Sequence, residues 1–138
     1  MLKSTGKIIY DPKRGDMKRR TDWWCVVDVD KEITRYMRWW VKKEYWIDLC
    51  QPSWDAHISV IRGEKPRPDL MHLWKKYQGE RVEFEYDLNI RRSGDTTGWD
   101  RPDHFWFVNV KCPKLIEIRK ELKMPSHWNL HLTIGRTY

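Results

Sequence analysis

Ala56-His57-Ile58-Ser59-Val60-Ile61 and Leu130-His131-Leu132-Thr133-Ile134-Gly135 are the two stretches that decide how this chain folds. Each places a histidine two residues before a hydroxyl residue inside an apolar, β-branched run, which is typical of a buried or half-buried strand. Side chains at positions i and i+2 of a strand point to the same face. The pattern therefore predicts that one imidazole and one hydroxyl project together from each of the two strands.

A single His-x-Ser or His-x-Thr match arises easily by chance, and one such histidine is equally well explained by a local hydrogen bond. Two matches, both with apolar neighbours, are a stronger signal. They lie more than half of the 138-residue chain apart, which fits two halves of a duplicated fold. We therefore take His57, Ser59, His131 and Thr133 as candidate catalytic residues.

The length of 138 residues predicts a single domain over residues 1–138, built as two intimately packed lobes. No apolar run approaches the ~20 residues needed to cross a bilayer, and the N-terminus lacks the apolar centre of a signal peptide. A cytoplasmic protein without membrane contact is therefore expected. Three cysteines far apart, without Cys-x-x-Cys spacing, indicate neither a disulfide framework nor a zinc site, and we expect them to be reduced packing residues.

The net charge of +7 and the ten tryptophans point to an anionic partner. Positive charge attracts phosphate-bearing ligands, and a tryptophan exposed near basic residues is a stacking surface for a nucleobase. The alternative is that most tryptophans simply fill the interior. The basic run over residues 11–20 likewise has two interpretations, a solvated loop or an arm that closes over an anionic ligand.

The remaining secondary structure is predicted from hydrophobic periodicity and from residues that start or end helices. Strands are expected over residues 6–10, 21–29, 81–91 and 104–112, and the strict alternation over 81–91 favours antiparallel pairing. Asp30 is expected to cap a helix, and Trp39 falls off that helix's apolar stripe. Further helices are expected over about residues 66–79, where Gly79 supplies the stop, and after Pro113. The order of strands and helices is that of an α+β fold with a strand–helix–strand pattern used twice.

His57-Ile58-Ser59-Val60 and His131-Leu132-Thr133-Ile134 resemble the paired signatures of the 2H phosphoesterase superfamily. This family includes RNA 2′,3′-cyclic phosphodiesterases and phage enzymes that degrade cyclic oligonucleotide immune signals. The resemblance implies a bilobed, duplicated α+β fold in which two antiparallel sheets line a central cleft, with helices packed outside and the motifs facing each other. It implies as substrate a cyclic oligonucleotide or an RNA end with a 2′,3′-cyclic phosphate. Serine replaces the commoner threonine in the first motif, which keeps the hydroxyl.

The chemistry can be argued from the residues themselves. Cleaving a phosphodiester needs a base for the attacking oxygen and an acid for the departing one, and two imidazoles can fill both roles. The sequence does not decide which histidine is the acid. The hydroxyls of Ser59 and Thr133 would donate hydrogen bonds to the non-bridging phosphate oxygens. No cofactor is expected, and two histidines without a nearby carboxylate or cysteine cluster make a metal site a weak alternative.

Further substrate contacts are candidates only. Arg62 and Arg136 each lie five residues beyond a motif histidine and could bind phosphate. Strand parity argues against both, because an odd spacing turns a side chain to the other face unless the strand ends or bulges first. Aromatic residues near the motif strands or in a loop are candidates for stacking on a base: Tyr10, Trp54, Trp99 and Tyr138. The alternative to catalysis is a nucleotide- or RNA-binding module that uses the same basic cleft without cleaving its ligand.

Overall fold

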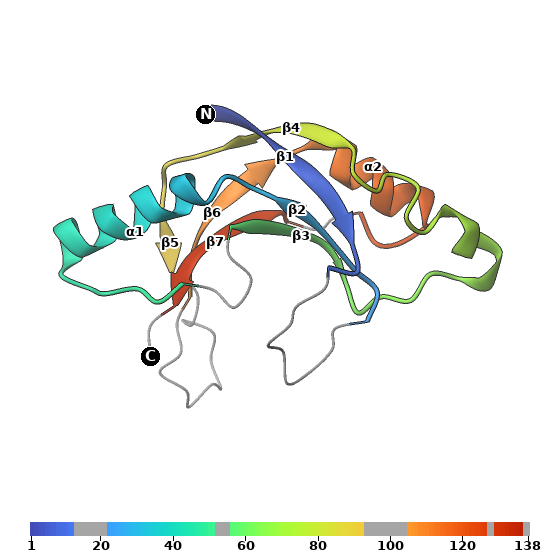
Figure 1. The fold of residues 1–138 in the computed structure, drawn as a ribbon, viewed down its shortest axis with the longest axis horizontal. Helices are drawn as coiled ribbons and strands as arrows, with labels where there is room; N and C mark the ends of the chain where they lie inside the picture. Colours follow the sequence, from blue (N-terminus) through green and yellow to red (C-terminus); the bar gives the residue numbers. More distant parts are fainter. Residues whose placement is uncertain (13–21, 52–55, 93–104, 127–128, 137–138) are drawn as a thin grey trace.

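The chain folds into a mixed α+β structure around one antiparallel sheet, shown by the computed structural model in Figure 1. The structure describes residues 1–12, 22–51, 56–92, 105–126 and 129–136. Within these ranges the strands are β1 (Leu2–Tyr10), β2 (Trp24–Asp28), β3 (His57–Arg62), β4 (Arg81–Tyr86), β5 (Arg91–Arg92), β6 (Phe105–Lys111) and β7 (His131–Arg136). The helices are α1 (Lys31–Tyr45), the 3-10 helix η1 (Pro68–Leu73) and α2 (Pro113–Glu121).

The sheet closes on itself. Its strand order is β4-β1-β2-β3-β7-β6-β5, and β4 also pairs with β6, so that six strands form a ring and β5 extends it at one edge. The two strands that carry the motifs, β3 and β7, are neighbours in this ring. The expectation of two lobes with separate sheets is therefore wrong. Hydrogen-bonded pairs join the two halves of the chain at β1–β4 and at β3–β7.

One apolar cluster fills the ring and extends to the helices. Alternating side chains of β4 show the pattern, since Val82, Phe84 and Tyr86 are buried while Arg81 and Glu83 are exposed. Both α-helices add their own apolar stripe to the same cluster, which includes Met37, Val41, Leu115 and Ile118. In Figure 1 the helices lie on opposite sides of the sheet, so that α1 and α2 flank the strands.

Several expected elements are confirmed and others differ. The Asp30 side chain caps α1 by accepting a hydrogen bond from the Glu32 backbone N–H at 2.9 Å. The helix expected after Pro66 is instead the short 3-10 helix η1 followed by turns. No residue of η1 is buried. The strand expected over 81–91 ends at Tyr86, and Leu88 is 59% exposed although the alternation predicted a packed side chain. Of the three cysteines, which are not disulfide-bonded, Cys25 and Cys112 are buried but Cys50 is exposed.

An ion pair between a buried arginine and a partly exposed glutamate fixes α2 to the end of β3. The Arg119 side chain is 1% exposed and donates hydrogen bonds to both carboxylate oxygens of Glu64, at 2.8 and 2.9 Å. It also donates to the backbone carbonyls of Val60 at 2.9 Å and Pro125 at 2.7 Å. The sequence places Arg119 on the packed stripe of its helix, and the structure shows which groups neutralise it there.

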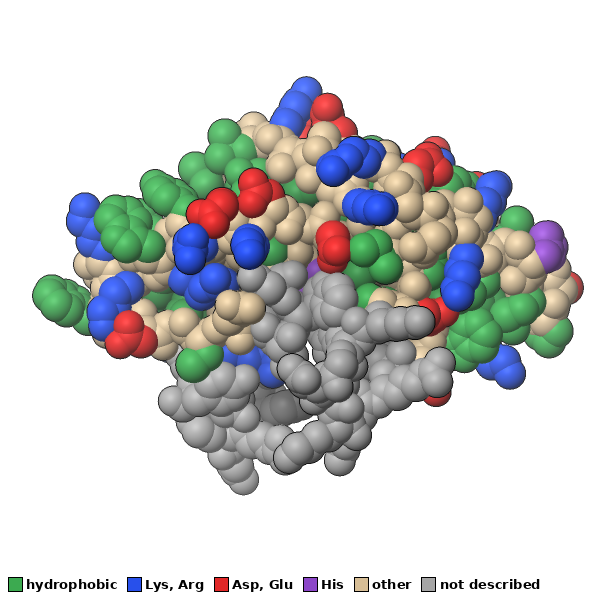
Figure 2. All heavy atoms as spheres, in the orientation of Figure 1, with side chains coloured by type: hydrophobic (Ala, Val, Ile, Leu, Met, Phe, Trp, Pro, Cys, Tyr) green, Lys and Arg blue, Asp and Glu red, His purple; other side chains and the backbone are tan. Residues whose placement is uncertain are grey.

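The surface of the molecule mixes charged and hydrophobic side chains. Figure 2 shows basic side chains spread over the face in view, with hydrophobic side chains among them at the end formed by α1. Among the residues that the structure describes, no helix combines the length and the apolar composition needed to cross a lipid bilayer.

Candidate active site

The two motifs meet on one face of the sheet. In the β3–β7 pair Ile58 lies opposite Leu132, and both side chains are 0% exposed in the core. Antiparallel pairing then places His57 opposite Thr133, and Ser59 opposite His131, with all four side chains on the outer, half-buried face. The two histidines are diagonal neighbours in this register, a position at which residues lie about 7–8 Å apart. Residues far apart in sequence thus share one small surface.

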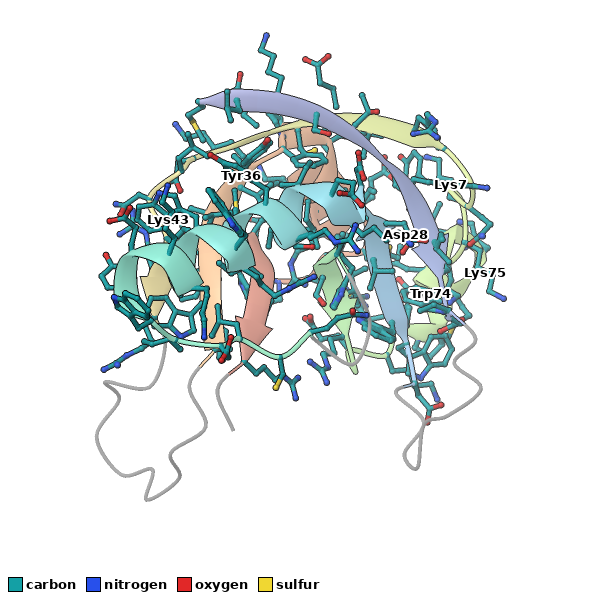
Figure 3. The ribbon with its side chains drawn as sticks, turned by 60° about the vertical axis from the view of Figure 1, so that its left-hand side comes forward. Lys7, Asp28, Tyr36, Lys43, Trp74 and Lys75 are labelled. Atoms are coloured by element: carbon teal, nitrogen blue, oxygen red, sulfur yellow. The ribbon has the colours of Figure 1, made fainter. Side chains whose placement is uncertain are left out.

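The strands beside the motif strands, β2 and β6, pair with them in the same way on both sides of the site. Asp28 of β2 lies opposite His57, and Asn109 of β6 lies opposite His131. Both pairs shift register just after the motif hydroxyl residue, so that β3 and β7 each gain one residue relative to their partner. The two halves of the site are therefore built alike, but a carboxylate stands beside one histidine and an amide beside the other. Figure 3 shows Asp28 on β2, with Lys7, its partner in the register, on β1.

The register shifts place both candidate arginines on the site face. In β3 two successive residues, Val60 and Ile61, are buried, and Arg62 follows with its side chain exposed. In β7 two successive residues are again buried before the half-exposed Arg136. An extra residue in a bulge reverses the alternation, so each arginine returns to the face of the motif hydroxyl. The exception to strand parity named in the sequence analysis, a bulge before the arginine, thus applies to both Arg62 and Arg136.

Aromatic side chains line both histidines. The Trp24 ring meets the His57 ring edge to face, with centroids 5.6 Å apart, and its Nε1–H donates to the Ser59 hydroxyl at 3.4 Å. Phe105 lies nearly parallel to the His131 ring, with a centroid distance of 6.1 Å, and Phe107 meets it at 5.4 Å. Because Ser59 Oγ accepts from the indole, its own proton is free to point to a ligand.

Sequence reasoning did not identify Trp24, Asp28, Phe105, Phe107 or Asn109 as site residues. The alternation of β2 places Trp24 and Asp28 on one face, which is a usable signal. That face becomes part of the site only through pairing with β3, and pairing partners are not encoded in a local pattern.

His131 is buried enough to change its titration. Burial lowers the pKa of its imidazole below the ordinary value of 6.5, and a hydrogen bond with the backbone of Asn129 partly opposes this effect. Burial disfavours the charged form of a histidine because the imidazolium loses its hydration. His131 is therefore mainly neutral at neutral pH, as a proton acceptor has to be.

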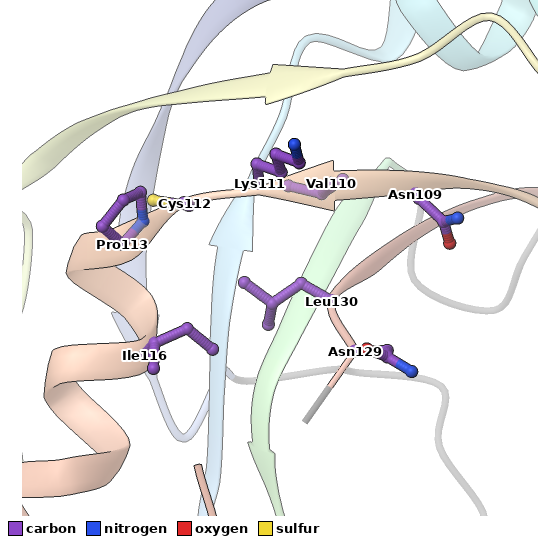
Figure 4. A pocket seen from close by; sticks show the side chains of 8 residues that line it. All are labelled: Asn109, Val110, Lys111, Cys112, Pro113, Ile116, Asn129 and Leu130. Carbon is purple, nitrogen blue, oxygen red and sulfur yellow. The ribbon is translucent and has the colours of Figure 1, made fainter. Parts of the chain in front are cut away.

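A pocket of about 500 Å³ adjoins the second motif. It includes Asn109, the register partner of His131, and Asn129, which lies two residues before that histidine. Figure 4 shows the amide groups of these two residues at one end of the pocket, and Ile116 and Pro113 at the other. This volume is within the range of small-molecule sites. An amide donates and accepts hydrogen bonds, so this end of the pocket can bind the polar edge of a base.

Of the four candidates for stacking on a base, the structure describes only Tyr10. Tyr10 belongs to the core, because its side chain is 4% exposed and its ring packs edge to face against Trp74 at 5.0 Å. It pairs with Cys25 on the inner face of the sheet, so the prediction that it stacks on a ligand is wrong. Trp54, Trp99 and Tyr138 lie outside the residues that the structure describes. Nor do the described residues gather three histidine, cysteine or acidic side chains into one potential metal-binding group.

The fold and site define a class of α+β protein in which a closed antiparallel sheet presents two histidine–hydroxyl pairs on one surface. No protein-family model matches the chain, and neither the curated proteins nor the solved structures contain a significant match.

Proposed function

We propose that this chain is a metal-independent phosphodiesterase of the 2H type that cleaves a ribonucleotide phosphodiester. The substrate class is a cyclic oligonucleotide messenger, such as phage enzymes degrade, or an RNA end with a 2′,3′-cyclic phosphate. The single observation that carries this proposal is the pairing of Ile58 with Leu132, because it sets both histidine–hydroxyl pairs on one half-buried face. The resemblance of the two motifs to the family signature points to the same chemistry.

The geometry supports a phosphate held between the imidazoles. Diagonal positions about 7–8 Å apart leave room for a phosphorus atom with its oxygens between two side chains that point the same way. The Ser59 and Thr133 hydroxyls, one beside each imidazole, would donate hydrogen bonds to the non-bridging oxygens. Each such donor is worth on the order of 2–4 kcal/mol in a site shielded from water. Arg62 and Arg136 on the same face add positive charge for the phosphodiester.

We infer the roles of the two histidines in hydrolysis from the burial of His131. Burial lowers the pKa of His131, so its imidazole is mainly neutral at neutral pH and suits the base, which leaves the acid to His57. His131 would take the proton of the attacking water as its oxygen bonds to phosphorus. The bond from phosphorus to the departing ribose oxygen then breaks, and His57 gives that oxygen its proton. In the reverse reaction, in which the ribose hydroxyl attacks phosphorus and closes the ring, the two roles exchange.

The test is turnover by the purified chain with a chelator present. The substrates are cyclic dinucleotides, cyclic trinucleotides and RNA with cyclic ends, and mass spectrometry identifies the products. We expect His57→Ala and His131→Ala each to lower turnover by about 10²–10⁴-fold, while the affinity for the same ligand survives. His72→Ala is the matched control, because His72 is an exposed histidine of η1 outside the site.

Two results would count against the phosphodiesterase. Near-wild-type turnover by either site variant in chelator would remove the two-histidine mechanism. Tight binding of a ligand from the panel with no product from any of them would instead support the binding module. The positive charge of the site face supports that alternative equally well, because both functions need an anion to bind.

A further inference from the structure

The outer side of α1 carries large aromatic side chains that the core does not use. Tyr36 is 59% exposed and Trp39 53%, and Trp46, which ends the helix, is 84% exposed. The opposite side of the same helix is packed, with Met37 at 2% and Val41 at 0%. A contiguous exposed apolar patch often marks an interaction site, whereas single exposed apolar side chains are normal on protein surfaces.

These aromatic residues form a stripe together with a cation. Tyr36, Trp39 and Lys43 are three and four residues apart, so they follow one another along one side of the helix. The Tyr36 and Trp39 rings are 5.9 Å apart and tilted by only 32°, and Lys43 Nζ lies 5.1 Å from the Trp39 ring centroid. Figure 3 shows Tyr36 and Lys43 on the same side of α1. We call these three residues the α1 stripe.

The charge around the α1 stripe selects an anionic partner. The helix sequence KEITRYMRWWVKKEY has five basic and two acidic residues, and the whole chain has a net charge of +7. Of the basic residues, Arg38 lies on the inner side of the helix and Arg35 is paired with Glu32. Lys42 is paired with Asp48 at 2.7 Å. Lys43 is the lysine that lies over the Trp39 ring. Ring faces next to a cation are what proteins use to stack unpaired bases and neutralise the adjoining phosphates.

We propose that the α1 stripe is a binding platform for single-stranded RNA, separate from the candidate active site. Unpaired bases stack on Tyr36 and Trp39, and Lys43 binds the backbone phosphate beside them. The choice of RNA over DNA rests on the proposed function, whereas the stacking and charge arguments do not. The inner side of α1 is fixed to β7, where Arg38 Nη1 donates to the Ile134 carbonyl at 2.8 Å. An oligonucleotide held by the α1 stripe is thus held next to the strand that carries His131.

The other occupants of an aromatic helix face fit the observations less well. A two-fold contact between copies of this chain would bring two basic helices face to face, which like-charge repulsion disfavours. A helix that lies in a membrane surface inserts a broad apolar face into the lipid. In α1 the broad apolar face is the one packed on the core, and the α1 stripe has no aliphatic side chain.

The experiment measures binding of a labelled, linear 2′-O-methyl oligouridine of about ten nucleotides, which spans a typical single-strand site and carries no cyclic phosphate, so that it is not a substrate of the proposed reaction. We expect Tyr36→Ala and Trp39→Ala each to weaken binding roughly 5- to 100-fold, the range for loss of one stacked base. Lys43→Gln should weaken it less and reduce the salt dependence by about one phosphate contact. Leu88→Ala, an exposed apolar side chain outside α1, and Lys120→Gln, an exposed lysine of α2, are the controls and should bind like wild type.

The outcomes separate this proposal from the proposed function. Trp39→Ala should leave turnover of a cyclic dinucleotide unchanged, because Trp39 is an exposed residue of α1 and none of the candidate active-site residues. Loss of oligonucleotide binding in the stripe variants of a chain that cleaves nothing would support the platform and remove the phosphodiesterase. Unchanged oligonucleotide binding in both aromatic variants would overturn the platform. So would a Trp39→Ala variant that loses binding to anionic vesicles, or loses self-association, while it still binds the oligonucleotide.

Discussion

At the residue scale, the difference between the two histidines lies in their partners across the strand pairs. His57 faces Asp28 and His131 faces Asn109, although the register is the same on both sides. Two identical imidazoles would compete for one proton. In the proposed mechanism one histidine has to start neutral and the other protonated, and the burial that lowers the pKa of His131 favours the neutral form there.

The lowered pKa of His131 leads to a prediction for the pH profile. A general base acts only when neutral, so the acidic limb of kcat/KM should lie below the ordinary histidine value of 6.5. Asn109→Asp would put a carboxylate opposite His131 and favour its protonated form. We expect the acidic limb to move to higher pH in this variant when rates are measured between about pH 5 and pH 9. Asn89→Asp adds the same charge at an exposed position and should not move it, and an unmoved limb in Asn109→Asp would assign the base elsewhere.

The buried Arg119 and its partner Glu64 predict a large stability effect outside the site. Arg119 is 1% exposed and depends on the Glu64 carboxylate for two of its hydrogen bonds. Glu64→Ala leaves a buried charge without its partner and should lower the free energy of unfolding by about 3–5 kcal/mol. The exposed Glu32–Arg35 pair of α1 is the control, and Glu32→Ala should change stability by no more than about 1 kcal/mol. Equal effects of the two variants in urea unfolding would contradict this account.

At the scale of the elements, the bulges of β3 and β7 decide what the site contains. Without them Arg62 and Arg136 would point to the core side of their strands. With them, the last residue of each strand presents a guanidinium on the face of the motif hydroxyl. The same irregularity occurring in both strands indicates that it is a feature of the site and not an accident of one loop.

The two arginines should therefore act on binding more than on chemistry. We expect Arg62→Ala and Arg136→Ala each to raise KM for a phosphodiester substrate by roughly tenfold, the usual effect of one charge-assisted contact, with a smaller change in kcat. The increase should shrink at high salt because the attraction is screened. Arg67→Ala, which removes an exposed arginine paired with Asp69, is the control. If neither site variant changed KM, the arginines would not touch the ligand.

Local sequence patterns predicted the elements whose signal is complete within a few residues. The cap at Asp30, the packed stripe of α1 and the inner face of β4 follow from side-chain chemistry and period alone. The bulges could not be predicted, because an apolar run such as Val60-Ile61 fits a regular strand equally well. Tyr10 was misplaced for a similar reason. An aromatic residue at a strand end looks the same whether it faces the core or a ligand, and only its pairing with Cys25 decides.

At the scale of the whole molecule, closure of the sheet is what joins the motifs. β3 and β7 are adjacent because β4 turns back to pair with both β1 and β6, which brings the second half of the chain beside the first. The sequence indicated two similar halves but contained no signal for how they join. The contacts that decide this are non-local and follow from how two apolar sheet faces cover each other.

Closure also predicts how the molecule unfolds. The six strands of the ring and both α-helices contribute to one apolar cluster, so neither half of the chain has a core of its own. A domain of this size with a single core should unfold in one cooperative step, and urea transitions followed by tryptophan fluorescence and by far-UV circular dichroism should coincide. Phe84→Ala removes a side chain 1% exposed in β4, and should lower the free energy of unfolding by about 3–5 kcal/mol with both probes shifted together. Separate lobes would give a different result, in which Phe84→Ala shifts one of two resolved transitions and leaves the other unchanged. Since β3 and β7 come from different halves of the chain, only the single-transition outcome ties the geometry of the four motif side chains to the stability of the whole sheet.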